Sequence, residues 1–234
     1  MNIALDLNKS RSLGRINNNY KSSLEYSIYI FKRNKIKMSS IIKHTVQFTK
    51  DEWNTLWDAC YDFARKEIVT TEQMRNKRGQ FNRKKMIYDT TVGKMGEWAV
   101  CWLFWQQNLD CSEPDMLIYE KHRKSFDADL ICDGVDLHVK SQCEEAARRY
   151  GTSFVFQKGG QGRGHTDPII RSGDGQAIFA VVHESTMSAE IYGPITTETL
   201  RQNLRDPKLD YLKKTKACLY LEDFTIKDTD NTLK

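Results

Sequence analysis

Three carboxylates, an imidazole and an ammonium group alternate between Asp127 and Lys140 of this 234-residue chain. The stretch is divided at residues 133–134 by an Asp-Gly dipeptide, which favours the two-residue turn of a β-hairpin. If the chain reverses there, Asp129 stands opposite His138, and Asp127 stands opposite Lys140. Side chains alternate between the faces of a strand, so these four polar groups share one face. A purely structural hairpin does not need such a face.

The opposite face of the same hairpin is apolar and is expected to face the core. It consists of Ala128, Leu130, Cys132, Val135, Leu137 and Val139. Asp136 lies on the polar face, one pleat from His138, and is a further candidate for assisting the site, together with Asp127.

The residue types on the polar face suit phosphodiester hydrolysis. Carboxylates hold Mg²⁺, which can lower the pKa of a bound water and clamp phosphate oxygens. A nearby lysine can position that water or stabilise the charge that grows on the phosphate. Imidazole binds softer metals better than Mg²⁺, so Mn²⁺ is expected to substitute.

The stretch resembles the core of the PD-(D/E)XK nuclease superfamily, which includes restriction enzymes, resolvases, repair nucleases and some phage homing endonucleases. That family has an acidic residue on one hairpin strand and an acid-x-Lys triplet on the next. Asp129 matches the first position and Lys140 the last, while His138 stands where the family usually has Glu or Asp. The resemblance implies that Asp129, His138 and Lys140 are catalytic, and that Asp129 and His138 bind the metal.

The segment 91–107 is expected to be a buried helix, because it is apolar almost all round. Glu97 is its only acidic residue and follows Gly93 and Gly96. The resemblance implies that Glu97 is a fourth catalytic residue and a metal ligand. An unpaired carboxylate is costly in so apolar a helix, so either a metal or a lysine partner is expected.

The resemblance also implies the fold, a restriction-endonuclease-like α/β core with a central mixed sheet flanked by helices. The element order would be α-β-β-β-α-β over residues 91–160, with additions at both ends. A first strand is expected at 115–119, a helix at 144–150 and a fourth strand at 153–157. Gln157, at the end of that fourth strand, is another candidate for assisting the site.

Outside this core, helical spacing of apolar residues predicts a helix that begins after Thr49. Apolar runs predict strands at 176–183, 189–192 and 217–221. A short helix is expected from Thr196 or Thr197 to Leu204, and another at 208–214.

The net charge of +5 is unevenly distributed. Residues 1–37 hold eight of the 36 basic residues and two of the 31 acidic ones, so the rest of the chain is nearly neutral. We expect residues 1–37 to be a flexible basic extension, or sequence upstream of a true start at Met38. Residues 38–234 are expected to form a single nuclease domain.

Residues 73–86 carry six basic residues and no acid, which makes them the best candidate for phosphate contacts. A solvated surface loop is the alternative. The DNA-binding candidates are Arg75, Lys77, Arg78, Arg83, Lys84 and Lys85.

The six cysteines occur singly, without a CxxC pair, and several lie in apolar runs. They are expected to be buried thiols of a reducing compartment rather than a disulfide framework or a zinc site. No apolar run is long enough to cross a bilayer, and no secretory signal is evident, so a cytoplasmic protein without a membrane partner is expected.

Three functions remain open on the sequence. The first is a metal-dependent DNA endonuclease that uses Mg²⁺, such as a restriction or phage homing enzyme acting in the host cytoplasm. The second is a catalytically inactive DNA-binding relative, and the third is an unrelated α/β protein with a solvated hairpin face. Cutting both strands symmetrically would require a homodimer.

Overall fold

A computed structural model describes residues 40–77, 79–119, 128–159, 166–172 and 175–233. The strands are β1 (Ser40–Gln47), β2 (Leu130–Cys132), β3 (Val135–Cys143), β4 (Ser153–Gln157), β5 (Gln176–His183), β6 (Ser188–Thr196), β7 (Lys216–Tyr220) and β8 (Thr225–Leu233). The helices are α2 (Lys50–Lys77), α3 (Arg83–Gln106), α4 (Glu144–Tyr150), α5 (Pro168–Ser172) and α6 (Thr197–Asn203), with 3₁₀ turns at Asp210–Leu212 and Leu221–Asp223.

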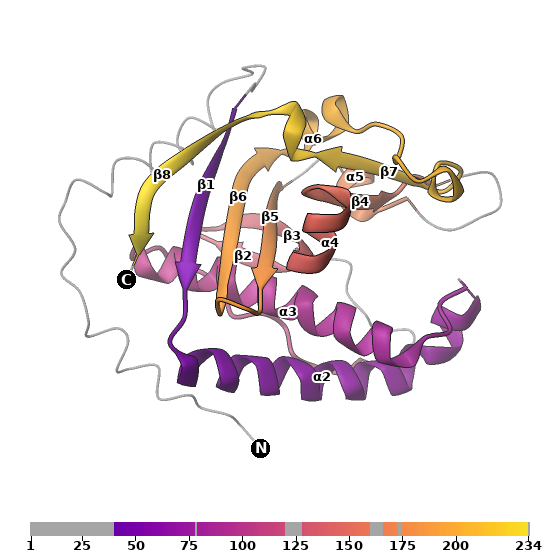
Figure 1. Ribbon diagram of the computed structural model, residues 1–234, viewed down its shortest axis with the longest axis horizontal. Helices are drawn as coiled ribbons and strands as arrows, with labels where there is room; N and C mark the ends of the chain where they lie inside the picture. The colour runs from indigo at the N-terminus through magenta and orange to yellow at the C-terminus, as the bar shows by residue number, and fades with distance from the viewer. Residues whose placement is uncertain (1–39, 78, 120–127, 160–165, 173–174, 234) are drawn as a thin grey trace. The chain divides into compact units, whose positions relative to one another are not determined.

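The central sheet has six strands in the order β2-β3-β5-β6-β1-β8, and β4 and β7 form a separate two-stranded sheet (Figure 1). The β3–β5 and β1–β8 pairs are parallel, and the other pairs are antiparallel. The expected α/β class, with a mixed central sheet flanked by helices, is therefore confirmed. None of the helices among the described residues is long and apolar enough to span a bilayer.

Helix α2 begins at a capping box. The Thr49 hydroxyl accepts a hydrogen bond from the Glu52 backbone N–H, and the Glu52 carboxylate accepts one from the Thr49 N–H. The apolar stripe that follows is buried, from Trp53 to Ala64, as helical spacing predicted. The helix continues to Lys77, well beyond that stripe.

Helix α3 starts at Arg83, eight residues earlier than predicted, because the side chain of Asn82 caps the Lys85 backbone N–H. The basic segment 73–86 is therefore not a loop. It comprises the end of α2, a short connection and the first turn of α3.

The β2–β3 hairpin has the predicted register: Leu130 pairs with Leu137, Ile131 with Asp136 and Cys132 with Val135. Residues 133 and 134 both have positive φ, as a type I′ turn requires. The alternation of buried and exposed residues also follows the prediction, because Leu130, Cys132, Leu137 and Val139 are buried and Ile131 is exposed.

Two elements of the expected core differ from the prediction. Residues 115–119 form no strand; instead Cys111 makes a single antiparallel bridge with Cys132 at the edge of β2. Strand β4 forms where expected but pairs with β7, and the strand that lies parallel to β3 is β5. The apolar content of β4 suits either sheet, so its sequence does not reveal its partner.

The predictions for the C-terminal half are largely confirmed. Strand β6 pairs with β5, Thr196 caps α6, and β7 covers most of the expected 217–221 strand. The helix expected at 208–214 is a single 3₁₀ turn. Strands β1 and β8, at the far side of the sheet, were not predicted.

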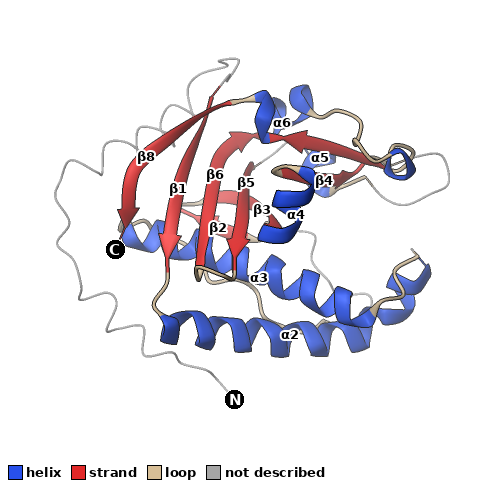
Figure 2. Cartoon of the chain, viewed as in Figure 1, coloured by secondary structure: helices blue, strands red, loops and turns tan. Residues whose placement is uncertain are grey.

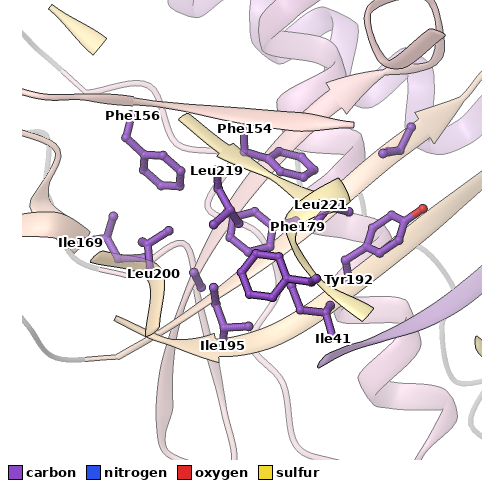
Figure 3. Packing of buried hydrophobic residues seen from close by; sticks show 13 residues of the cluster. Ile41, Phe154, Phe156, Ile169, Phe179, Tyr192, Ile195, Leu200, Leu219 and Leu221 are labelled. Atoms are coloured by element: carbon purple, nitrogen blue, oxygen red, sulfur yellow. The ribbon is translucent and has the colours of Figure 1, made fainter. Parts of the chain in front are cut away.

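The two faces of the central sheet bury different cores. Helix α3 packs on the face that carries Ser141 and Ala180, where the Gly96 backbone comes close to both side chains. The opposite face carries Phe179, whose cluster includes Phe154 of β4 and Leu219 of β7 (Figure 3). The β4–β7 sheet thus covers the face that α3 does not.

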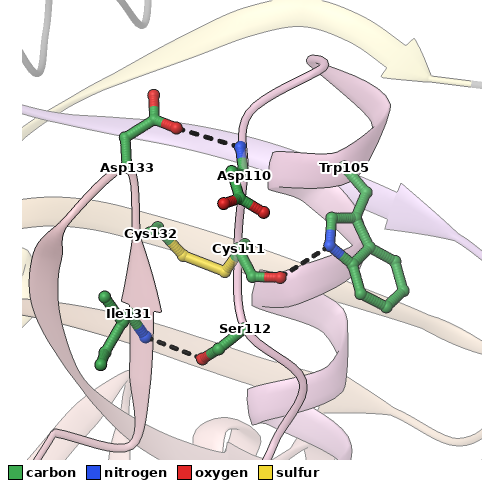
Figure 4. The surroundings of a disulfide bond; sticks show 7 residues. All are labelled: Trp105, Asp110, Cys111, Ser112, Ile131, Cys132 and Asp133. Carbon is green, nitrogen blue, oxygen red and sulfur yellow. Dashed lines mark hydrogen bonds between the residues drawn. A yellow bond between two sulfur atoms is a disulfide. The ribbon is translucent and has the colours of Figure 1, made fainter.

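The bridge beside β2 is closed by a disulfide between Cys111 and Cys132 (Figure 4). The Ser112 N–H donates to the Ile131 carbonyl, and the Trp105 indole N–H donates to the Cys111 carbonyl. The prediction that all cysteines are thiols is therefore wrong for this pair, which lies 21 residues apart in sequence. Cys60, Cys101, Cys143 and Cys218 are free.

Candidate active site at the β2–β3 hairpin

Asp129 lies immediately before β2 and is fixed to β3 by two hydrogen bonds. Its backbone N–H donates to the Leu137 carbonyl (2.9 Å), and its Oδ2 accepts from the Val139 N–H (2.8 Å). Asp129 is thus anchored to the two residues that flank His138. This placement agrees with the expected position opposite His138.

His138 is half-buried beside the start of β5, where it pairs with Ala177. Gly175 makes this approach possible, because it has φ +83° and a Cβ there would lie 2.9 Å from the Asp136 carbonyl oxygen. The same Cβ would lie 3.4 Å from Cδ2 of His138. The backbone at Gly175 therefore closes one side of His138.

Lys140 points to the face that β4 covers. Its Nζ lies 3.0 Å from Oδ2 of Asp167 and 5.6 Å from the centre of the Phe156 ring. The side chain of Lys140 is 31% exposed and that of Asp167 13%. Asp167 is held by its own backbone N–H, which donates to the Gln157 carbonyl (3.1 Å). Lys140 is thus a fixed cation at the junction of β3, β4 and α5.

Glu97 is buried in α3, and Lys94, one helical turn earlier, lies 2.6 Å from its Oε2. The lysine partner expected for this carboxylate is therefore present. The ammonium of Lys94 also lies 5.2 Å from the centre of the Phe63 ring of α2. Burial, with a smaller contribution from the Glu97 charge, raises the pKa of Cys60 to about 12, so Glu97 also lies near α2.

The structure does not bring Glu97 together with His138 and Lys140. Helix α3 contacts the face of β3 that carries Ser141, whereas His138 and Lys140 alternate onto the other face. Among the described residues, no three His, Cys, Asp or Glu side chains lie close enough to hold a metal ion. The register of the hairpin thus places Asp129, His138 and Lys140 on one face, and Asp167 pairs with Lys140.

The three assisting candidates have different outcomes. Asp136 is exposed, and alternation along β3 places it on the same face as His138. Gln157 contributes its backbone carbonyl, which positions Asp167. Asp127 lies outside the described residues.

The DNA-binding candidates divide into two groups. Arg75 is half-buried and donates to Glu67, Thr71 and Thr90, so it ties α2 to α3. Lys85 forms an i,i+4 pair with Asp89. Arg83 and Lys84 are exposed to solvent, Arg78 lies outside the described residues, and the side chain of Lys77 is not described.

Sequence reasoning missed Asp167, and it expected a lysine partner for Glu97 without identifying Lys94. The i,i+3 spacing of Lys94 and Glu97 was a usable signal, because residues three apart are neighbours on a helix. Asp167 lies 27 residues from Lys140 and reaches it only because β4 packs across β3. No local pattern indicates such a contact.

A separate polar cluster lies on β1, β5 and β6. Glu190 accepts from Tyr192 (2.7 Å) and lies near Lys43 and His183. Hydrogen bonding by His183, then by Tyr192, and the charge of Lys43 lower the pKa of Glu190 to about 2. The pKa of His183 is raised, chiefly by the same hydrogen bond. These charges balance one another within the fold.

Comparison with known proteins identifies no relative: no family model, curated protein or solved structure matches the chain.

Proposed function

We propose that this protein is a metal-dependent DNA endonuclease with a restriction-endonuclease-like core and a reaction centre at Lys140. The observation that carries the proposal is the placement of Lys140 as a fixed, partly buried cation. It lies on β3, two residues beyond His138, and Asp129 is anchored across the hairpin. This is the arrangement of acid and lysine that phosphodiester hydrolysis needs.

The role of Lys140 follows from its contacts. Holding a long, flexible side chain against Asp167 and Phe156 restricts its rotamers before DNA binds. A charge that is fixed in advance needs no reorganisation when negative charge grows on the phosphate, so it stabilises the transition state more effectively than a mobile charge. Asp167 is then a positioning residue, which acts through Lys140.

The residues present suit a metal site that is completed by the substrate. Mg²⁺ is commonly held by one or two protein carboxylates, and phosphate oxygens and water fill its other positions. Asp129 and His138 would hold it here, and when bound it would lower the pKa of a water molecule and neutralise phosphate charge. A set of three protein ligands is therefore not required.

The catalytically inactive DNA-binding relative is the second candidate. One observation favours it: the ammonium of Lys140 is already paired with Asp167. Such a protein would keep the basic surface near Arg83 and would bind DNA without cutting it.

A cleavage assay separates the two. Purified protein should nick or linearise supercoiled plasmid in Mg²⁺ or Mn²⁺ and leave it intact in EDTA. DNA binding that weakens with salt, without cleavage in either metal, would select the inactive relative. Neither binding nor cleavage on intact, gapped and branched DNA would reject both.

A further inference from the structure

Residues 79–82, in the connection between α2 and α3, have a defined conformation. The Gly79 N–H donates to the Asn76 carbonyl (2.9 Å), and the Gln80 N–H donates to the Arg75 carbonyl (3.1 Å). Asn82 then caps α3. The two helices are tied together below this connection by Arg75, which reaches Thr90 of α3 (3.4 Å). Residues 79–82 therefore form a structured tip at the end of the helical pair (Figure 2).

Phe81 is at this tip, and 75% of its surface is exposed. The aromatic residues between α2 and α3, in contrast, contact one another: the rings of Trp53 and Trp57 stack, and the ring of Tyr88 contacts Trp57. A single exposed apolar residue is common on protein surfaces and indicates nothing by itself. The residues next to Phe81 are therefore needed to interpret its exposure.

Two unbalanced cations follow Phe81. Arg83 and Lys84 are exposed in the first turn of α3, and within the described chain neither has an acidic partner. That turn contains no acidic residue, although the helix dipole favours acids over bases there. The local charge is therefore arranged against the stability of the helix. A nucleic-acid backbone would supply the missing negative charge.

We infer that this tip binds DNA, with Phe81 stacked on an unstacked base and Arg83 and Lys84 on the adjoining phosphates. The inference rests on the proposed function in taking DNA as the partner, and it names the kind of DNA. Inserting a ring into a continuous duplex requires base steps to unstack, whereas a gap or an unpaired base already offers an open face. The tip therefore selects DNA that contains unstacked bases.

Equilibrium binding of the full chain in EDTA tests this without cleavage. We expect tighter binding to a duplex with a short single-stranded gap than to the same duplex without the gap. Phe81→Ala should weaken binding to the gapped duplex by about five- to a hundredfold, the range typical of one base–aromatic stack, with little change for the continuous duplex. Phe81→Trp should retain the preference, because it keeps a stacking surface.

A fluorescent base gives an independent readout. 2-Aminopurine placed in the gap should be quenched by the wild-type protein and not by Phe81→Ala, because stacking on the ring causes the quenching. Tyr211→Ala is the matched control: Tyr211 is 77% exposed, but the nearby Lys213 is paired with Asp210. It should bind both DNAs like the wild type.

The cations should act differently from the ring. Arg83→Gln and Lys84→Gln should weaken binding to both DNAs alike, and each should reduce the slope of log affinity against log salt by about one. Because all three side chains are exposed and the two cations oppose the helix dipole, no variant should unfold at a lower temperature than the wild type.

The outcomes separate this inference from the proposed function. The inference is overturned if the wild type binds no DNA. It is also overturned if Phe81→Ala or Tyr211→Ala changes the affinity for the gapped and the continuous duplex equally. Binding to gapped DNA that depends on Phe81, without cleavage in any metal, would uphold the inference and reject the nuclease. Cleavage of DNA, with an affinity that does not change in Phe81→Ala, would uphold the nuclease and overturn the inference.

Discussion

Lys140 and Glu97 are both charged groups inside the fold, and each is balanced by a partner of opposite sign. Glu97 has Lys94 three residues away on the same helix, whereas Lys140 has Asp167 from a distant segment. A buried charge without a partner is destabilising, so Lys94 offsets the cost of burying Glu97, whereas the partly exposed Lys140 keeps part of its hydration. The proposed chemistry concerns Lys140, which lies beside the hairpin.

His44 is a buried histidine that should make the protein sensitive to acid. Only 5% of its surface is exposed, and burial lowers its pKa to about 4. In the unfolded chain the same group takes up a proton below about pH 6.5. Stability is therefore lost as the pH falls from about 6.5 towards 4, by roughly 3 kcal/mol in total. Urea unfolding at pH 7 and pH 5 should show about 2 kcal/mol of this loss.

His44→Gln should remove that part of the pH dependence, because glutamine does not titrate and can still bond to Thr229, which lies 3.0 Å from Nδ1 of His44. His183→Gln is the contrasting control. Glu190 raises the pKa of His183, so protonation of His183 stabilises the fold, and its contribution is lost as the pH rises. Removing the His183 imidazole should therefore make stability fall more steeply as the pH decreases. An unchanged slope in His44→Gln would contradict the assignment.

At the scale of elements, the packing of α3 on β3 depends on Gly96. A Cβ at this position would lie 2.0 Å from Oγ of Ser141 and 3.1 Å from Cβ of Ala180. Gly93, on the same helix, has nothing within 4 Å of the equivalent position, although Ser141 donates to its carbonyl. The two glycines are therefore close in sequence, but only Gly96 lacks space for a side chain.

Gly96→Ala should destabilise the protein by about 1–3 kcal/mol, because overpacking outweighs the gain in helix propensity. Gly93→Ala, the matched control, should be neutral or stabilising by up to about 1 kcal/mol. Chemical unfolding of both variants checks the pair. Equal effects would mean that helix propensity, not contact with β3, decides the outcome.

The elements that sequence predicted best are those whose signals are local. The Asp-Gly turn and the alternation around it determine the β2–β3 register, and the capping box at Thr49 and the stripe after it define the start of α2. Strand β1 was missed because Ser40–Gln47 mixes polar and apolar residues at an inner position of the sheet. Strand β8 was missed because Thr225–Leu233 is largely polar.

The candidate site was predictable in part for the same reason. Asp129 and His138 lie within one hairpin, so turn chemistry alone brings them together. The pairing of Asp167 with Lys140 and that of Cys111 with Cys132 depend on how distant segments pack, which periodicity does not encode. Glu97 was expected to lie near Asp129, His138 and Lys140, and it does not. The sequence of a helix does not indicate which face of the sheet the helix covers.

At the scale of the whole molecule, residues 37–234 group as one compact unit. The buried apolar residues of the described chain run from Ile41 to Phe224. Residues 1–37 hold eight basic and two acidic residues, and under the proposed function we expect this excess of positive charge to attract DNA at long range.

A chain of residues 38–234 should therefore fold cooperatively, with a thermal midpoint within a few degrees of the full chain. Its DNA affinity should fall mainly at low salt, where basic residues contribute most. Calorimetry and binding at two salt concentrations check both statements. Insoluble or non-cooperative protein would show that residues 1–37 belong to the fold.

The most direct test of the proposed function is the cleavage rate of Lys140→Ala under single-turnover conditions in Mg²⁺. We expect a loss of at least about a hundredfold, the effect of removing one group that stabilises the transition state, with DNA affinity nearly unchanged. Lys158→Ala is the control, because Lys158 is also a lysine paired with an aspartate, Asp206, but at an exposed site. It should cut at the wild-type rate. If Lys140→Ala also cuts at the wild-type rate, Lys140 is structural and the proposed reaction centre is wrong.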